Sequence, residues 1–503
     1  MHKLFPTAGC FVLFMLSDAA IGRSPSVDDS VRAEGLRPVS IDLCQASNPI
    51  AKLSDCRNGT LPRLGKRIDA AMRTAIAKAG PHAAPLIKRD QTWFSDMVAS
   101  VAEDVSDDAA TIKSMLQERL AALEGISAGF GRDGVVGLWA NAFGTIDIEP
   151  ARDGSVRAAV VTASVYAPDD EQHYTCGIAA LLLRPTPEGW LAGTPESTDA
   201  PGTDDRKPRA IVRLRRQGLT LRVVAGDESR PHDTSGLDCT RDINQVTGTY
   251  FAWGGSGAAA AKPPAADAPS FDCQQPKTAD EEEICADPEL AVNDRRLDRA
   301  WRQLLPRLDP VTRRLFAEDQ REYARSQALQ YLDYLHPSSA KETWMVHHTG
   351  LGRDWLYRVQ LERIAALEGF EETRRGFEGL WMANNARLMV TRGDSGRLTA
   401  YGDKWFHNDR KSGCEYDIAG TTKGYAFKSD HERTNPDTLE RDHGSLVVNR
   451  FDDVFAKRRY KADGTPINSS DEPKCKRNGT ISSTARLFPV RPSPDIETSH
   501  DSR

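Results

Sequence analysis

The same order of landmarks occurs twice along this chain. Each copy has a close cysteine pair, an amphipathic helical stretch, a Gly-Leu-Trp, and a strand-rich stretch closed by a distant cysteine pair. A shift of 229 positions carries the first close pair onto the second. The matching landmarks are Cys44/Cys56 with Cys273/Cys285, Asp90-Gln91 with Asp319-Gln320, Glu118–Gly125 with Glu362–Gly369, Trp139 with Trp381, and Cys176/Cys239 with Cys414/Cys475. Two related units in series predict a scaffold or a binding protein before they predict one active site.

Apolar periodicity predicts two kinds of module in each half. Apolar residues recur at helical spacing after each close cysteine pair, and Asp287-Pro288 is typical of a helix start. Gly125 and Gly369 are expected to end a third helix in each copy. After each Gly-Leu-Trp the pattern changes to alternation with turn residues between, which is typical of strands. We therefore expect an α+β fold: a tandem duplication of a small disulfide-stapled three-helix module followed by an antiparallel β-sheet or barrel module.

The composition along the chain sets the expected boundaries. Residues 254–270 are nearly all Gly, Ala, Pro and Ser, so they can bury little and are predicted to form a flexible linker. The expected segments are a signal peptide at 1–22, helical module 1 at 23–126, β-module 1 at 131–253, helical module 2 at 271–370, β-module 2 at 376–490, and a tail at 491–503.

The first residues are typical of a secretory signal. His2 and Lys3 precede a mostly apolar run, and small residues at Ala20 and Gly22 suit cleavage after Gly22. Lipidation at Cys10 is disfavoured because most of the apolar run follows that cysteine. No later apolar stretch approaches the roughly 20 residues that span a bilayer. We expect a periplasmic or secreted protein without a transmembrane segment.

Eight cysteines remain when Cys10 is set aside, and an even number in an exported chain predicts disulfides. The duplicated order suggests one short and one long bridge in each half. The expected pairs are Cys44–Cys56, Cys176–Cys239, Cys273–Cys285 and Cys414–Cys475. The spacings, with no C-x-x-C, do not fit a zinc site.

Enzyme signatures are absent from the sequence, which has no phosphate-binding loop, no H-E-x-x-H and no dinucleotide-binding fingerprint. Ser338–Lys341 matches S-x-x-K without its companion motifs, and His347-His348 has no further ligand at a suitable spacing. We expect no catalytic residue, no metal and no cofactor. A cell-envelope hydrolase with carboxylates that the sequence does not single out stays as an alternative, as does a purely structural envelope protein.

Two repeated features have a structural and a functional interpretation. A carboxylate beside an amide, as in Asp90-Gln91 and Asp319-Gln320, suits a ligand site, but a helix surface plus a buried amide hydrogen bond at the turn of a three-helix unit is favoured. Trp139 and Trp381 are likewise expected to be core anchors rather than sugar platforms.

The second helical module resembles a known family. The residues that carry the resemblance are Phe271-Asp272-Cys273, Glu283–Ala291, Asp294, Leu297, Gln320, Tyr323, Arg325 and Arg363–Leu367. They resemble the LprI-type lysozyme-inhibitor N-terminal domain, with a weaker copy in the first half. Tyr323 stands where the family usually has Trp, and Trp355-Leu356 where Cys-Leu is usual. The resemblance implies an exported envelope or periplasmic binding protein, with inhibition of a lysozyme-like muramidase as one activity.

An acidic run, Asp280–Glu283, lies within the second close cysteine pair. Glu281, Glu282, Glu283 and the nearby Asp287 are expected to form a negative surface patch that could attract a basic lysozyme-like partner. The alternative is a solvated helix entrance, where negative charge is favoured. A net charge of −6 argues against nucleic acid as a partner. The sequence does not indicate an oligomeric state.

Overall fold

The computed structural model describes residues 44, 54–104, 109–129, 134–162, 165–167, 172–174, 177–194, 210–227, 246–254, 268–335, 351–393, 396–406, 409–423, 426–429, 438–449 and 485–496. Expectations for the signal peptide, for most of the linker, for Ser338–Lys341 and for His347-His348 lie outside these residues. The same is true of Cys176, Cys239 and Cys475 and of the Cys414 side chain.

The first half begins with a pair of long helices. They are preceded by α2 (Ser54–Arg57), which the disulfide Cys44–Cys56 ties to the preceding chain. Helix α3 (Thr60–Asp104) is two helices joined at Gly80, where φ is 71° and ψ is 179°. That conformation is essentially restricted to glycine, so Gly80 sets the kink. Helix α4 (Ala109–Gly129) packs beside α3.

A barrel follows these helices. In the described part of the first half, eight antiparallel strands close in the order β1-β10-β9-β8-β7-β6-β3-β2. Its interior is filled by side chains such as Trp139 and Tyr250, so the barrel is a packed core. The strands are β1 (Gly137–Ala140), β2 (Gly144–Pro150), β3 (Val156–Thr162), β6 (Gly177–Pro185), β7 (Leu191–Gly193), β8 (Ala210–Gln217), β9 (Thr220–Asp227) and β10 (Gly248–Ala252), with a separate hairpin of β4 (Val165–Ala167) and β5 (Gln172–Tyr174).

The second half repeats the succession of helices and strands. The predicted bond Cys273–Cys285 is confirmed and holds the chain before α5 against its last turn. The apolar side chains of Trp301, Phe316 and Phe488 join the helices to the sheet that follows. The helices are α5 (Ala279–Ala286), α6 (Pro288–Leu304), the 3-10 turn η4 (Leu305–Arg307), α7 (Pro310–Leu335) and α9 (Leu351–Glu368).

The second sheet also closes on itself, through pairing of its first and last described strands, β11 and β18. Its interior is again apolar and includes Trp381, Leu388 and Leu446. The strands are β11 (Gly379–Ala383), β12 (Ala386–Arg392), β13 (Leu398–Phe406), β14 (Asp409–Lys423), β15 (Ala426–Ser429), β16 (Thr438–Asp442), β17 (Ser445–Asn449) and β18 (Ala485–Val490).

One predicted helix end is wrong. We expected Gly125 to stop the third helix of the first half, but α4 continues to Gly129. A Cβ atom at Gly125 would lie 1.9 Å from Nε1 of Trp253, so this glycine allows the close approach of the chain that leaves the barrel. In the second half α9 ends at Glu368, so Gly369 follows the helix as expected.

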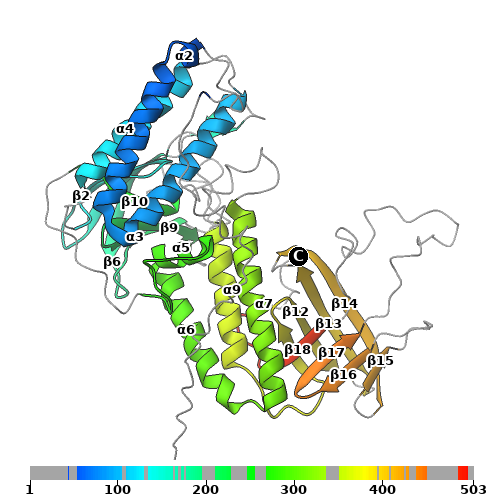
Figure 1. The fold of residues 1–503 in the computed structure, drawn as a ribbon. Helices are drawn as coiled ribbons and strands as arrows, with labels where there is room; N and C mark the ends of the chain where they lie inside the picture. The colour runs from blue at the N-terminus through cyan, green and yellow to red at the C-terminus, as the bar shows by residue number, and fades with distance from the viewer. Residues whose placement is uncertain are drawn as a thin grey trace, which may run out of the picture.

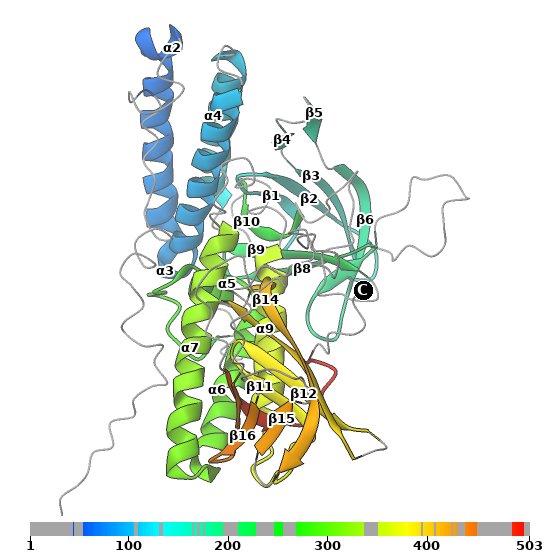
Figure 2. The same ribbon diagram turned by 90° about the vertical axis from the view of Figure 1, so that its right-hand side faces the viewer.

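The two halves lie end to end, with α5 between them (Figures 1 and 2). Each half places its barrel beside its own helices, and α5 reaches the region where the first barrel and helix α3 meet. None of the helices in the described ranges is both long enough and apolar enough to cross a bilayer.

Candidate functional site

The acidic run is not a surface patch. The exposed fractions of Glu281, Glu282, Glu283 and Asp287 are 5%, 2%, 3% and 0%. Our expectation of a solvent-facing patch, and its alternative of a solvated helix entrance, are therefore both wrong. The physical reason is that α5 is covered on one side by the first half of the chain and on the other by α7 and α9. Glu281, Glu283 and Asp287 each have a hydrogen-bond or ion-pair partner.

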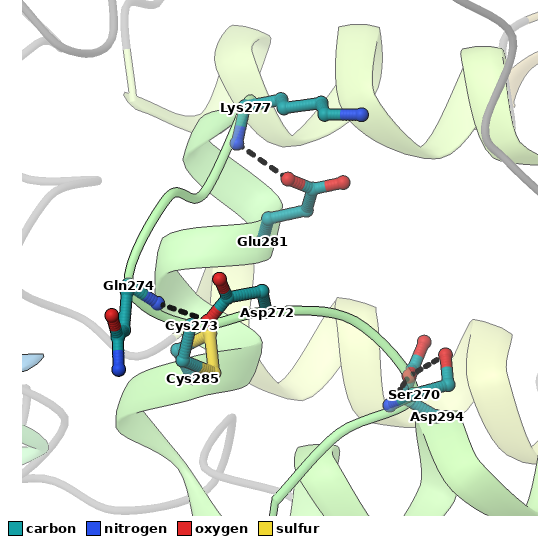
Figure 3. The surroundings of a disulfide bond; sticks show 8 residues. All are labelled: Ser270, Asp272, Cys273, Gln274, Lys277, Glu281, Cys285 and Asp294. Carbon is teal, nitrogen blue, oxygen red and sulfur yellow. Dashed lines mark hydrogen bonds between the residues drawn. A yellow bond between two sulfur atoms is a disulfide. The ribbon is translucent and has the colours of Figure 1, made fainter.

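The first two acids of the run complete the structure of α5 itself. Figure 3 shows Glu281 turned back so that its carboxylate accepts the backbone N–H of Lys277, beside the Cys273–Cys285 disulfide. Asp280 accepts from the Thr278 hydroxyl and from the Gln327 amide on α7. Both carboxylates lie in the first turn of α5, at the positive end of the helix, where negative charge is stabilised. These two side chains hold the start of α5 in place.

Glu283 is the first acid that reaches across to the other half. Its Oε2 lies 2.8 Å from Nη2 of Arg89 on α3, and its Oε1 lies 2.5 Å from Nη2 of Arg222 on β9. The hydroxyl of Tyr331 on α7 donates to the same carboxylate at 3.0 Å. Burial alone would raise the pKa of Glu283, but the guanidinium groups of Arg222 and Arg89 outweigh it and hold the pKa below its ordinary value.

Asp287 combines a capping role with two ion pairs. Its Oδ1 accepts the backbone N–H groups of Glu289 and Leu290, which is the predicted N-cap of α6. Its Oδ2 accepts from Nε of Arg222 and from Nε of Arg353, each at 3.0 Å. Burial opposes ionisation, yet Arg353 and Arg222 together lower the pKa of Asp287. One buried carboxylate thus fixes both a helix start and the contact between the halves.

Glu289, two residues after Asp287, is the next acid along the chain. It accepts a hydrogen bond from Nη1 of Arg213 on β8 and another from Nη2 of Arg353 on α9. The Arg213 guanidinium also lies over the ring of Trp190, and that of Arg353 over the ring of Tyr357, each 5.0 Å from the ring centroid. Stacking of this kind fixes the guanidinium plane and suits arginine better than lysine.

We call this cluster the ionic junction: Arg89, Arg213 and Arg222 from the first half, with Glu283, Asp287, Glu289, Arg353 and Asp354 from the second. It has four guanidinium groups and four carboxylates. Buried charges of this kind are tolerated only when they are paired and hydrogen-bonded. The cluster can bind and position guanidinium groups.

Glu282 lies beside the ionic junction and differs from its neighbours. Its Oε2 is buried and accepts no hydrogen bond from the residues that the structure describes. Burial raises the pKa of Glu282 to about 8, against the opposing charges of Arg89 and Lys88 on α3 and with the help of Glu283. Near neutral pH this carboxyl therefore holds a proton and is uncharged. The four guanidinium groups of the ionic junction then face four carboxylates and no fifth negative charge.

The sequence interpretation missed the arginines. Arg213 and Arg222 lie on neighbouring strands and point out of the barrel, since Val212, Leu214, Leu221 and Val223 fill its interior. Val224, also on the outside, is 0% exposed. A strand with an apolar and an arginine side chain on its outer face is a signal that the face is covered.

The repeated Asp-Gln pairs hold each helical unit to its barrel. Asp90 lies 2.8 Å from Nη1 of Arg119 and accepts the backbone N–H of Ala142, while Gln91 accepts from Nε of Arg119. In the second half the same contacts join Asp319 to Arg363 and Asn384, and Gln320 to Arg363. The predicted buried amide bond is confirmed in both halves, with Arg119 and Arg363 as its unforeseen partners. The expected helix-surface position is wrong, since the side chains of Asp90 and Asp319 are largely buried by these contacts.

The two tryptophans are core anchors, as expected. Trp139 and Trp381 are each 0% exposed, and the indole N–H of each donates to the carbonyl four residues earlier, in Val135 and Phe377. No group of three or more His, Cys, Asp or Glu side chains gathers as a metal site within the described ranges. Compared with known proteins, the chain matches no family model, no curated protein and no solved structure.

Proposed function

We propose that this chain is an exported binding protein of the LprI type, in which two related helix-and-barrel units are fixed against each other. The observation that carries the proposal is the α5–α6 element. Residues that resemble the family signature, Cys273, Cys285 and Asp287, form one interlocked unit whose buried acids bind arginine side chains. A disulfide-closed element of this kind is typical of an oxidising compartment, which supports a periplasmic or secreted location.

The two units arise, in this proposal, from a tandem duplication. Support comes from contacts that recur in the same places. Both Asp-Gln pairs hold an arginine of the last helix, and both barrel-opening tryptophans donate to the carbonyl four residues earlier. Arg216 and Arg441, each on a strand just before a turn, also donate to Gly134 and Gly376, which lie ahead of those tryptophans. Shared ancestry explains this agreement better than chance convergence.

The candidate partner is a basic lysozyme-like muramidase, which the family resemblance suggests. Because the acidic run is occupied within the chain, the contact surface for such a partner lies outside the ionic junction. A rigid pair of barrels on a helical frame favours binding, since little conformational entropy is lost when the partner docks.

A muramidase assay tests the proposal. The purified mature chain, at micromolar concentration, is added to a basic lysozyme acting on peptidoglycan, and lysis and direct binding are both followed. Slower lysis with a saturable binding isotherm is expected. Neither inhibition nor binding would remove the muramidase as partner, and degradation of peptidoglycan by the chain alone would place it among the hydrolases.

A further inference from the structure

We infer that the α5–α6 element is a receptor for arginine side chains, and that its resident ligand is the first half of the same chain. The halves are then held by their own complementary surfaces, and the linker between them acts only as a tether. This inference does not depend on the proposed muramidase partner. It follows from the contacts that cross between residues before 255 and residues after 267.

Buried ion pairs form the centre of the contact. Arg89 and Arg222 of the first half both bind Glu283, Arg222 binds Asp287, and Arg213 binds Glu289. The side chains of Arg89 and Arg222 are 4% and 2% exposed. Charge pairs removed from water in this way slow dissociation and select one partner. The recognition is geometric, because Arg222 spans Glu283 and Asp287 with two different nitrogen atoms.

Around the ionic junction, apolar side chains of each half pack into a core cluster of the other half. Ala286, the last residue of α5, belongs to a core cluster made of first-half residues such as Ala79, Ile87 and Phe251. In return, Trp93 of α3 packs against the second-half cluster that contains Ile284 and Leu290. Each half therefore completes a core of the other. An interface with apolar contacts on both sides of buried arginine pairs has the features of a stable binding surface.

Contacts within the second half hold the acids of the α5–α6 element in place. Asp287 is fixed by its cap on α6 and by Arg353, and Glu283 is fixed by Tyr331, all within the second half. The disulfide Cys273–Cys285 closes the segment that carries these acids. Preorganised acceptors bind more tightly because less ordering is needed on association.

Cutting the linker tests the inference on the complete chain. A recognition sequence for a specific protease is placed at residues 258–262, the folded protein is cleaved, and the fragments are examined by size-exclusion chromatography with light scattering at physiological salt. The fragments are expected to elute together at the mass of the intact chain. Separate elution of two folded fragments would overturn the inference, as would a covalent link that survives cleavage on a non-reducing denaturing gel.

Arginine substitutions test whether the ionic junction is the surface that holds the two fragments together. In the cleavable chain, Arg222→Ala is expected to weaken association by at least about 30-fold, because the change leaves buried carboxylates short of a partner. Arg213→Ala probes the less buried pair and stays useful if Arg222→Ala does not fold. Arg67→Ala is the matched control, since Arg67 pairs with Glu124 at the exposed surface of the first half. Equal association of the Arg213 variant, the Arg67 variant and the parent would exclude the ionic junction as the holding surface.

Discussion

Nε of Arg222, on the outer face of the first barrel, lies 3.0 Å from Oδ2 of Asp287, the residue that caps helix α6. The two residues are 65 positions apart and belong to different halves of the chain. Both side chains are almost fully buried, so neither charge is compensated by water. The start of a helix in one half therefore depends on a strand in the other, and the halves are expected to unfold as a coupled unit.

Replacement of Arg222 by alanine is the most direct test of that coupling. Arg222→Ala leaves Glu283 and Asp287 without a shared partner in a buried site. Breaking a buried pair by removing one side costs about 3–5 kcal/mol, so the free energy of unfolding should fall by roughly that amount. Equilibrium urea unfolding, followed by tryptophan fluorescence, measures it.

An exposed pair provides the comparison. Arg67 and Glu124 lie 3.5 Å apart with side chains 62% and 58% exposed. Arg67→Ala should change the free energy of unfolding by no more than about 1 kcal/mol, because surface ion pairs contribute little. If both variants lost the same small amount, the ionic junction would not contribute to stability as a buried pair does.

The two roles of Asp287 can be separated by two substitutions. Asp287→Asn keeps an oxygen that accepts the backbone N–H groups of α6, but it removes the charge that faces Arg222 and Arg353. Asp287→Ala removes both functions. We expect each variant to lose about 3–5 kcal/mol from the ion pairs, and the alanine variant about 1 kcal/mol more from the cap. Urea unfolding of both proteins gives the difference, and an asparagine variant as stable as the parent would show that the charge is unimportant.

Local patterns in the sequence predicted most of the elements. Strands were expected after each Gly-Leu-Trp, and the structure has them there, from β2 to β10 in the first half and from β12 to β18 in the second. Alternation and helical spacing report on which face of an element is buried, and this is decided largely within the element. The kink at Gly80 was not predicted, because a glycine within a helical pattern does not itself reveal a positive φ.

The candidate site was much less predictable, and the reason is long-range pairing. A run such as Glu281, Glu282 and Glu283 is a sign of exposure only if nothing covers it. The covering residues Arg89 and Arg222 lie far away in the sequence, the latter 61 positions before Glu283. Their position depends on how the first barrel packs against α5, which no local pattern encodes. Burial of these acids therefore follows from the packing of the two halves and could not be predicted from the acidic run alone.

The matched pair Asp90 and Asp319 offers a test of the repeated architecture. Each binds the arginine of the last helix in its half and accepts a backbone N–H from the turn after the first barrel strand. Asp90→Ala and Asp319→Ala should each lower the free energy of unfolding by about 3–5 kcal/mol, since each leaves the charge of a buried arginine without its carboxylate. Thermal unfolding by calorimetry measures both. A large loss in one half and none in the other would show that the two contacts are not equivalent.

Glu282, whose pKa is raised, should make the folded protein less stable as the pH rises. Glu283 and Asp287, whose pKa values are lowered, should have the opposite effect. Burial raises the pKa of Glu282 from 4.5 in the unfolded chain to about 8 in the folded protein, so folding favours the protonated form. The contribution is fully present below pH 4.5 and is lost as the pH rises through about 8. Its upper bound is about 5 kcal/mol, since one pKa unit corresponds to 1.36 kcal/mol. The contribution of Glu282 to the stability of the parent should therefore fall between about pH 5 and pH 8 and level off at higher pH.

The substitution Glu282→Gln isolates this effect. Glutamine resembles the protonated carboxyl and cannot ionise, so the fall between about pH 5 and pH 8 should largely disappear and the variant should be the more stable protein at pH 9. Arg89 and Glu283 face the same site, but the pKa of Arg89 is raised and that of Glu283 is lowered, so both stay charged over that range and do not imitate the change. Asp298→Asn, at a surface pair with Arg302, is the control and should follow the parent. Urea unfolding at several pH values decides the matter: parallel curves for the parent and Glu282→Gln would mean that Glu282 is ionised throughout.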